Sequence, residues 1–216
     1  MTSKKISILD YGVSNLLNVT RAIAYLGHSF EVINSPSQVL SSDMIILPGV
    51  GAFGDAMRSL QSTGLDQALI EFVKGKERPL FGICLGMQLL METSTEFENC
   101  KGLNLIKGDV VKIPENVSSD KLRRVPHVGW SPLEFKNDSG NESHRNLFYD
   151  VKNGEGVYFV HSFMASNTND VSSFTHYERL RIPASLAKDN IAAAQFHPER
   201  SGKVGLHILD NFIRYY

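Results

Sequence analysis

The chain has 216 residues, a length that fits one domain of moderate size and can bury a hydrophobic core without disulfides or a structural metal. With 22 Lys and Arg, 23 Asp and Glu and a formal net charge of −1, it has no charge excess that favours nucleic acid or a membrane surface. Its two cysteines are too few for a disulfide framework, and no apolar run is long enough to cross a bilayer. The first residues lack the apolar region of a signal peptide, so we expect a cytoplasmic protein with a single domain over residues 1–216.

The first hundred residues alternate between strand-like and helix-like segments. Short apolar runs predict strands, whereas apolar residues three or four positions apart predict helices. Gly27 is expected to end the first helix, and Gly64 to interrupt the second. This alternation predicts βαβ units and a parallel sheet. The expected strands are residues 5–10, 30–33, 44–47 and 79–84, and the expected helices are residues 15–26, 55–74 and 87–92.

After residue 102 the pattern changes to short β-rich segments separated by polar loops. We expect a surface loop between residues 137 and 146, where Gly, Asn, Asp and Ser cluster, and a solvated loop at the basic residues 121–124. The β-rich segments are residues 109–113, 157–163 and 192–196, and an amphipathic helix at 203–216 follows them. The sequence therefore predicts one α/β domain whose sheet is parallel in its first half and mixed in its second.

A cysteine lies where the expected strand 79–84 meets the next helix, in the segment Gly82-Ile83-Cys84-Leu85-Gly86. This is the G-x-nucleophile-x-G turn, which needs glycines because side chains on either side of the nucleophile would clash. The turn lifts the sulfur clear of the sheet and places it at a helix N-terminus, which favours the thiolate. The alternative is a buried, inert cysteine between packing glycines. The five-residue pattern at a strand–helix junction favours the nucleophile.

A cysteine nucleophile needs a base, and the base needs a third group that holds its tautomer. The best candidate is His197, which follows the expected strand 192–196 in the segment Phe196-His197-Pro198-Glu199. Pro198 fixes the backbone there, and Glu199 can turn back toward the imidazole. The other six histidines lack such neighbours. No Cys/His cluster has metal-ligand spacing, so we expect neither a metal nor another cofactor.

The loop after the third expected strand, residues 49–54, fits the dinucleotide-binding pattern G-x-G-x-x-G. Three features argue against dinucleotide binding. Pro48 directly precedes the loop, and the loop follows the third expected strand instead of the first. The region about 20 residues further on, where the fingerprint has an acid after a strand, is expected to be helical. Such a loop can instead aim backbone N–H groups at a developing negative oxygen. The expected donors are Leu85, directly after the nucleophile, and Val50 or Gly51.

These elements, in this order, resemble the triad (class I) glutamine amidotransferases. The resemblance implies a three-layer, flavodoxin-like fold with a central mixed, mostly parallel sheet and helices on both faces. It also implies that Cys84, His197 and Glu199 form the catalytic triad. Within the family, and over essentially the whole chain, the sequence is similar to the glutaminase subunits of imidazole glycerol phosphate synthases, from histidine biosynthesis. The segments that carry this similarity are residues 10–12, 15–16, 48–53, 126–130 and 158–162.

The resemblance also implies residues for the substrate and for a partner. Trp130 and Arg200 match positions near the synthase interface, although Arg200 stands where Lys is common and Ser131 where Asn is usual. The alternative for Gln88 and Glu96 is a solvated helix face, and for Phe163 it is plain core. The residues implied to hold glutamine are Gly49, Gln88, Glu96, Ser162 and Phe163.

The implied reaction is the hydrolysis of L-glutamine to glutamate and ammonia. Because ammonia in neutral water is mostly ammonium, a poor nucleophile, and one domain accounts for the residues, we expect a partner that receives it directly. The resemblance names a (β/α)8-barrel cyclase subunit, in a heterodimer that makes imidazole glycerol phosphate and an aminoimidazole carboxamide ribotide. The glycines flanking Val50 predict a loop that can flip and so switch the oxyanion site. Three alternatives stay open: a glutaminase for another synthase, a nucleotide-binding module, and a non-catalytic partner-binding relative.

Overall fold

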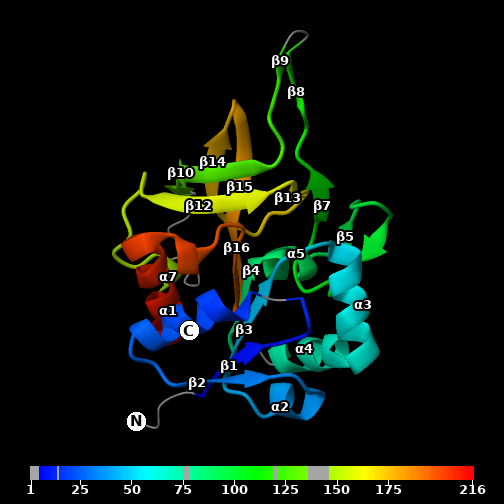
Figure 1. Ribbon diagram of the computed structural model, residues 1–216, viewed down its shortest axis with the longest axis vertical. Coiled ribbons are helices and arrows are strands. Elements are labelled where there is room, and N and C mark those ends of the chain that lie inside the picture. The colour runs from blue at the N-terminus through cyan, green and yellow to red at the C-terminus, as the bar shows by residue number, and fades with distance from the viewer. Residues whose placement is uncertain (1–4, 14, 75–77, 119–120, 136–145) are drawn as a thin grey trace.

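The computed structural model describes residues 5–13, 15–74, 78–118, 121–135 and 146–216. An eight-stranded sheet runs through its centre, formed by β1 (Ile6–Leu9), β2 (Phe30–Ile33), β3 (Met44–Gly49), β4 (Leu80–Cys84), β11 (Glu134–Phe135), β14 (Val171–Tyr177), β15 (Leu180–Lys188) and β16 (Ile191–Ala194). The order is β11-β14-β15-β16-β4-β3-β1-β2 (Figure 1). The pairings from β2 to β16 are parallel and the remaining ones antiparallel. The expectation of a parallel first half and a mixed second half is confirmed.

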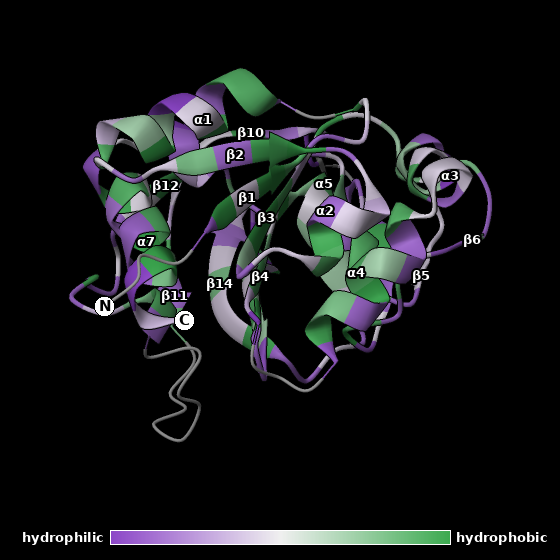
Figure 2. Cartoon of the chain, turned by 90° about the horizontal axis from the view of Figure 1, so that it is seen from below, coloured by the Kyte–Doolittle hydropathy of each residue, from purple (hydrophilic) through white to green (hydrophobic). Residues whose placement is uncertain are grey.

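Helices cover both faces of this sheet, which gives the three layers that the resemblance implies (Figure 2). On one side lie α1 (Leu16–Tyr25) and α7 (Gly202–Tyr215), and on the other α2 (Pro36–Leu40), α3 (Phe53–Thr63), α4 (Leu65–Val73) and α5 (Leu85–Leu89). Side chains alternate across a strand, so β3 sends Met44 and Ile46 into the core beneath α1 and α7, and Ile45 and Leu47 into the other. Among the described helices, none is long and apolar enough to cross a membrane.

Smaller sheets extend the carboxyl-end side of the large one. Strands β10 (His127–Pro132) and β12 (Gly156–His161) pair antiparallel, and β13 (Phe163–Ser166) pairs with β7 (Asp109–Lys112) beside β5 (Thr93–Ser94) and β6 (Cys100–Lys101). A hairpin of β8 (Asn116–Ser118) and β9 (Lys121–Leu122) projects from them (Figure 1). The expected strand 157–163 is therefore two strands in different sheets, which part at Ser162.

Several predicted elements differ from the structure. The helix expected at 87–92 starts at Leu85 and ends at Leu89, because the tight turn at Cys84 passes directly into it. Helix α2 and the long strands β14 and β15 were not predicted. The solvated loop expected at 121–124 is wrong for Arg123, which is buried and donates to the backbone carbonyl oxygens of the residues Pro114, Tyr177 and Glu178. Most of the loop expected at 137–146 lies outside the described residues.

Candidate active site

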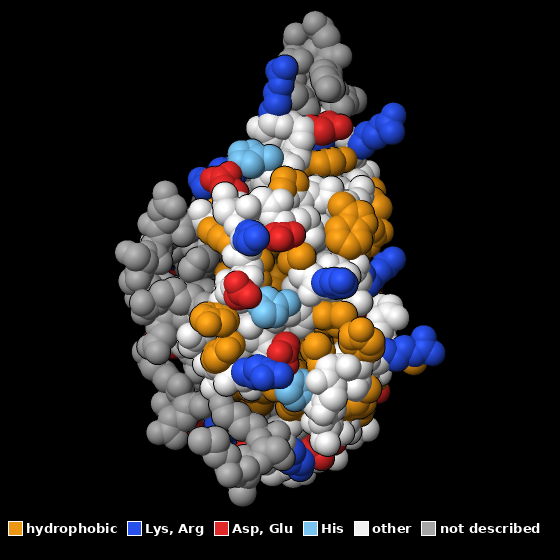
Figure 3. Space-filling view, turned by 90° about the vertical axis from the view of Figure 1, so that its left-hand side faces the viewer, with side chains coloured by type: hydrophobic (Ala, Val, Ile, Leu, Met, Phe, Trp, Pro, Cys, Tyr) orange, Lys and Arg blue, Asp and Glu red, His pale blue; other side chains and the backbone are white. Residues whose placement is uncertain are grey.

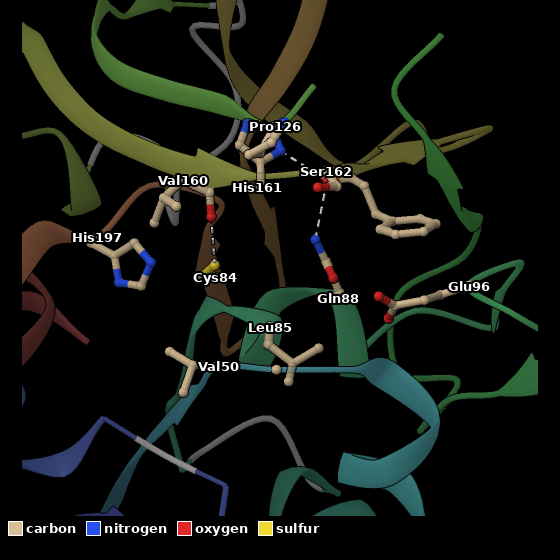
Figure 4. Close-up of a pocket in the computed structure, with 12 residues that line it drawn as sticks. Val50, Cys84, Leu85, Gln88, Glu96, Pro126, Val160, His161, Ser162 and His197 are labelled. Carbon is tan, nitrogen blue, oxygen red and sulfur yellow. Dashed lines mark hydrogen bonds between the residues drawn. The ribbon is translucent and has the colours of Figure 1, made fainter. Parts of the chain in front are cut away.

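A pocket of about 340 Å³ opens at the carboxyl end of β4 (Figure 4). It gathers residues from the loop after β3, from α5, from the segment before β6, and from the ends of β12 and β16. Nine of its lining residues were predicted from the sequence: Val50, Gly51, Cys84, Leu85, Gln88, Glu96, Ser162, Phe163 and His197. Pro126, Val160 and His161 also line the pocket, although the sequence analysis did not assign them to the site.

Cys84 occupies a strained turn between β4 and α5. Its φ of 54° and ψ of −107° lie outside the regions that L-residues ordinarily adopt. The turn is possible because the chain comes very close to itself there. A Cβ on Gly86 would lie 1.9 Å from the Leu47 carbonyl oxygen, and one on Gly82 would lie 2.9 Å from the Gly86 backbone. The predicted need for glycines on both sides of the cysteine is therefore confirmed as a steric one.

The Cys84 sulfur is largely enclosed but reaches the pocket, with 8% of the residue exposed. The side chain of Gln195 donates from Nε2 to Sγ at 3.8 Å, and the Val160 carbonyl oxygen lies 4.0 Å from Sγ (Figure 4). Gln195 is fully buried at the end of the strand that leads to His197. Gln195 thus places an amide N–H donor against the sulfur of the candidate nucleophile.

His197 and Glu199 form a buried pair beside Cys84. His197 Nδ1 lies 2.8 Å from Glu199 Oε1, and the two side chains are 4% and 1% exposed. A carboxylate oxygen can only accept, so Nδ1 carries a proton. Burial lowers the pKa of His197, but its interactions with Cys84 and Glu199 outweigh burial and raise that pKa to about 10. The buried Nε2 of His197 has no hydrogen-bond partner among the described residues, so it is free for a reacting group.

The loop after β3 borders the pocket, and its conformation is defined by one backbone hydrogen bond and a positive φ. The Val50 N–H donates to the Val13 carbonyl oxygen at 3.2 Å, so in this conformation it is engaged away from the oxyanion role predicted for it. Gly51 has a φ of +101°. Gly49, predicted to contact substrate, does not line the pocket, because it packs so closely on Tyr11 that a Cβ would lie 2.4 Å from the tyrosine hydroxyl.

The far end of the pocket carries a buried amide and a carboxylate. Gln88 Nε2 donates to the Phe163 carbonyl oxygen and to Gln195 Oε1, each at 3.1 Å. The alternative of a solvated helix face is wrong for Gln88, which is buried. Glu96 Oε2 accepts from the Phe53 N–H at 2.7 Å, at the first residue of α3. The pocket thus offers polar groups at the end opposite His197 (Figure 4).

Trp130 and Arg200 lie outside the pocket but are brought together. Both contact Tyr158: the ring centroids of Trp130 and Tyr158 are 6.1 Å apart, and the Arg200 guanidinium lies 4.6 Å from the tyrosine ring centroid. Trp130 is 60% exposed. We call Trp130, Tyr158 and Arg200 the aromatic cluster. An exposed tryptophan beside an arginine is typical of protein–protein contacts.

Within the described residues there is no group of three or more His, Cys, Asp or Glu placed to hold a metal ion. On the face shown in Figure 3, basic and acidic side chains are interspersed with apolar ones. That face thus lacks the single-sign field that steers a protein to nucleic acid.

Three comparisons show what the chain is similar to. The family model "Glutamine amidotransferase class-I" matches residues 7–215. A Legionella pneumophila (strain Lens) protein named imidazole glycerol phosphate synthase subunit HisH 1 is 40% identical over 97% of this chain and 98% of its own. A HisH subunit of the same synthase from Caldanaerobacter subterraneus subsp. tengcongensis is 42% identical over 96% of both chains. The solved structure of PurLQS from Thermotoga maritima superposes with a TM-score of 0.69 over 99% of both chains at 19% identity, which supports the fold.

Proposed function

The chain belongs to the class-I glutamine amidotransferase family, and on this basis we propose that it is the glutaminase subunit of an imidazole glycerol phosphate synthase. The observation that carries the chemistry is the meeting of Cys84 with the His197–Glu199 pair in one pocket. The subunit assignment rests on relatives of that name that match nearly the full chain. The protein acts as one amidotransferase domain over residues 1–216, in the cytoplasm.

In the first half-reaction the side-chain amide of L-glutamine lies against Cys84. The thiolate attacks the amide carbon, and the negative charge moves to the amide oxygen. His197 holds a proton at Nε2, as its raised pKa favours, and gives it to the departing nitrogen. The C–N bond breaks, ammonia leaves, and a glutamyl thioester remains on Cys84.

In the second half-reaction water replaces ammonia. His197, now neutral, takes a proton from water at Nε2, and the hydroxide attacks the thioester carbon. The C–S bond breaks, Cys84 leaves as thiolate, and glutamate is released. The sum is glutamine plus water giving glutamate plus ammonia, and both catalytic groups return to their starting states. Glu199 keeps the imidazole oriented throughout by accepting from Nδ1.

Substrate is held at the end of the pocket opposite His197. Gln88 donates both protons of its amide nitrogen, one to the Phe163 carbonyl oxygen and one to Gln195 Oε1. Its amide oxygen therefore accepts a hydrogen bond from the glutamine substrate. Glu96 has one oxygen on the Phe53 N–H, and its other oxygen attracts the substrate ammonium group. The backbone at Ser162 and Phe163 borders the same space.

The oxyanion is stabilised by backbone N–H groups at Leu85 and in the loop at Val50 and Gly51. The Val50 N–H is engaged with Val13, so the loop must rotate before that amide can serve. We therefore assign the described loop to a low-activity state. The cyclase subunit, a (β/α)8 barrel that consumes ammonia, binds at the aromatic cluster and favours the rotated state when its own substrate is present.

The test uses the complex with the cyclase subunit and two nitrogen sources. With glutamine, Cys84→Ala should lower both glutamate release and imidazole glycerol phosphate formation by at least about 10³-fold, as loss of a nucleophile does. With an ammonium salt, product formation should be unchanged, because the cyclase reaction does not need Cys84. Cys100→Ala, at the other free cysteine, is the matched control. Glutaminase activity at the wild-type level in Cys84→Ala would overturn the assignment.

A further inference from the structure

A buried chain of hydrogen bonds runs from β10 to the pocket through two histidines that the reaction does not use. Ser131 Oγ lies 3.0 Å from His127 Nε2, and His127 Nδ1 lies 3.0 Å from His161 Nε2. His161 Nδ1 then lies 2.8 Å from the Phe163 carbonyl oxygen. The three side-chain members are buried, and His127 and His161 are directly opposed in the β10–β12 ladder. We call Ser131, His127 and His161 the histidine chain.

The hydrogen bonds of the histidine chain can be donated in one direction only, from Ser131 toward the Phe163 carbonyl oxygen. The Phe163 carbonyl oxygen accepts, so His161 must carry its proton on Nδ1 and accept at Nε2. His127 must then donate from Nδ1 and accept at Nε2, and Ser131 must donate its hydroxyl proton. Burial lowers the pKa of His127 to about 4 and that of His161 to about 3, so both rings are neutral at physiological pH. Each proton position is therefore fixed by its neighbour.

The inner end of the histidine chain reaches the substrate groups. The Phe163 carbonyl oxygen is shared, because Gln88 Nε2 also donates to it. The second Gln88 proton goes to Gln195, which donates in turn to Cys84 Sγ at 3.8 Å. The position of the Phe163 carbonyl therefore sets the orientation of the Gln88 amide, and with it the oxygen that faces the pocket.

The outer end depends on a bend in β10. A straight strand rises about 3.3 Å per residue, so side chains four residues apart would be separated by about 13 Å. Ser131 nevertheless reaches His127, and Gly129 between them has a φ of +137°, which favours glycine. The His127 ring is held between Phe159, at a centroid distance of 4.9 Å, and Tyr177, at 4.1 Å. The ring is thus fixed in plane and in tautomer.

We propose that Ser131, His127 and His161 are positioning residues for glutamine, which act by holding the Phe163 carbonyl and the Gln88 amide through a chain of donors of fixed direction. This rests on the proposed function, because it assumes that the pocket binds glutamine. Ser131 does not line the pocket, and the hydrogen bonds that connect it to the substrate groups run through the two histidines. An asparagine at this position could also donate an N–H to His127, whereas an aspartate could only accept.

The test compares Ser131→Ala, Ser131→Asn and Ser131→Asp in the complex with the cyclase subunit. Loss of one buried donor should raise the glutamine KM of Ser131→Ala by about 3- to 10-fold, with kcat within about twofold of wild type. Ser131→Asn should restore KM, and Ser131→Asp should raise it most, because it opposes the direction of the chain. Ser172→Ala is the control, because Ser172 is also buried and its hydroxyl forms a hydrogen bond with Ser185 at 2.7 Å in the β14–β15 pair.

Nitrogen NMR of the imidazoles supplies a readout that does not need activity. In the wild type, both His127 and His161 should carry the proton on Nδ1, and Ser131→Asp should move the His127 proton from Nδ1 to Nε2. The proposal would be overturned if either histidine of the wild type carried its proton on Nε2, or if the KM of Ser131→Ala were unchanged. It would also be overturned if Ser172→Ala changed KM as much as Ser131→Ala does. A fall in kcat alone would overturn it too. A wild-type complex that does not hydrolyse glutamine at all would instead overturn the proposed function, and this proposal with it.

Discussion

The backbone N–H of Val50 donates a hydrogen bond to the Val13 carbonyl oxygen, at 3.2 Å, in the loop that borders Cys84. This bond ties the loop after β3 to the turn after β1, and it occupies an amide that the proposed mechanism needs. Releasing it costs about 1 kcal/mol, the net worth of one hydrogen bond. A binding partner can supply that much free energy easily, so the two loop states can be close in energy and still be switched.

The loop state can be biased from within the chain at Gly51. Its φ of +101° suits glycine, and a Cβ there would meet no atom within 4 Å. Gly51→Ala therefore strains the described conformation without a clash, by about 1 kcal/mol. We expect the ratio of glutaminase rates with and without the cyclase substrate to fall by about fivefold. The measurement is glutamate release by the complex in both conditions.

Gly154→Ala is the matched control for this strain. Gly154 has a φ of +91° and equally open surroundings, but it lies in the turn before β12 and away from the pocket. It should lose similar stability and keep the wild-type ratio of rates. A Gly51→Ala complex whose ratio equals that of Gly154→Ala would mean that the loop conformation does not control activity.

Glu199 acts through His197 by a single oxygen. Oε1 accepts from Nδ1 at 2.8 Å, whereas Oε2 is buried without a hydrogen-bond partner among the described residues. Glu199→Gln keeps the shape but removes the charge that helps to raise the pKa of His197. We expect kcat for glutamine to fall by about 10²-fold or more, with ammonium-dependent synthesis by the complex unchanged. Equal rates for wild type and Glu199→Gln would remove Glu199 from the mechanism.

The parts of the site that follow one another in the chain could be predicted from the sequence. Cys84 and its flanking glycines form one turn, and His197 and Glu199 are two residues apart, so the local pattern carries the geometry. Gln195 was missed as a functional residue, although a glutamine that ends the apolar strand before His197 was a usable signal. Its two contacts in the site lie 107 and 111 residues away in the chain, and no local pattern reports them.

The elements of the fold also differ in how well the local sequence predicts them. Strands whose residues are apolar on both faces, such as β3 and β4, were predicted to within two residues at each end. Strand β14 was not, because hydroxyl groups occupy buried positions and hide the apolar pattern. Ser172 and Ser173 both pair with Ser185 of β15. Helix α2 was missed although Ser35 followed by Pro36 is a helix-start signal.

The two histidines of the histidine chain should make the free energy of unfolding decrease as the pH falls. Their folded pKa values, about 4 for His127 and about 3 for His161, lie below the ordinary value of 6.5. The unfolded chain therefore binds more protons than the folded one as the pH falls below 6.5, and folding stability is lost through that window. Each histidine adds up to about one proton to the slope.

His127→Gln tests this dependence directly. Urea midpoints measured from pH 8 to pH 4.5 should fall less steeply in the variant than in the wild type once the pH passes below 6.5. Above pH 7 the difference between the two proteins should be constant, because the wild-type ring is then neutral in both states. Parallel curves across the whole range would show that His127 does not carry the buried, neutral state assigned to it.

The aromatic cluster predicts where the cyclase subunit binds. Trp130 exposes 60% of its surface on the outer side of β10 and meets Arg200 across Tyr158. Central tryptophans of interfaces commonly contribute 2 kcal/mol or more, so Trp130→Ala should weaken binding to the cyclase by about 30-fold. Titration calorimetry gives the dissociation constant. Tyr25→Ala is the control, because Tyr25 is 78% exposed at the end of α1 and takes no part in the cluster. If both variants bind as the wild type does, the partner docks elsewhere. If Tyr25→Ala alone weakens binding, the face beside α1 is the interface.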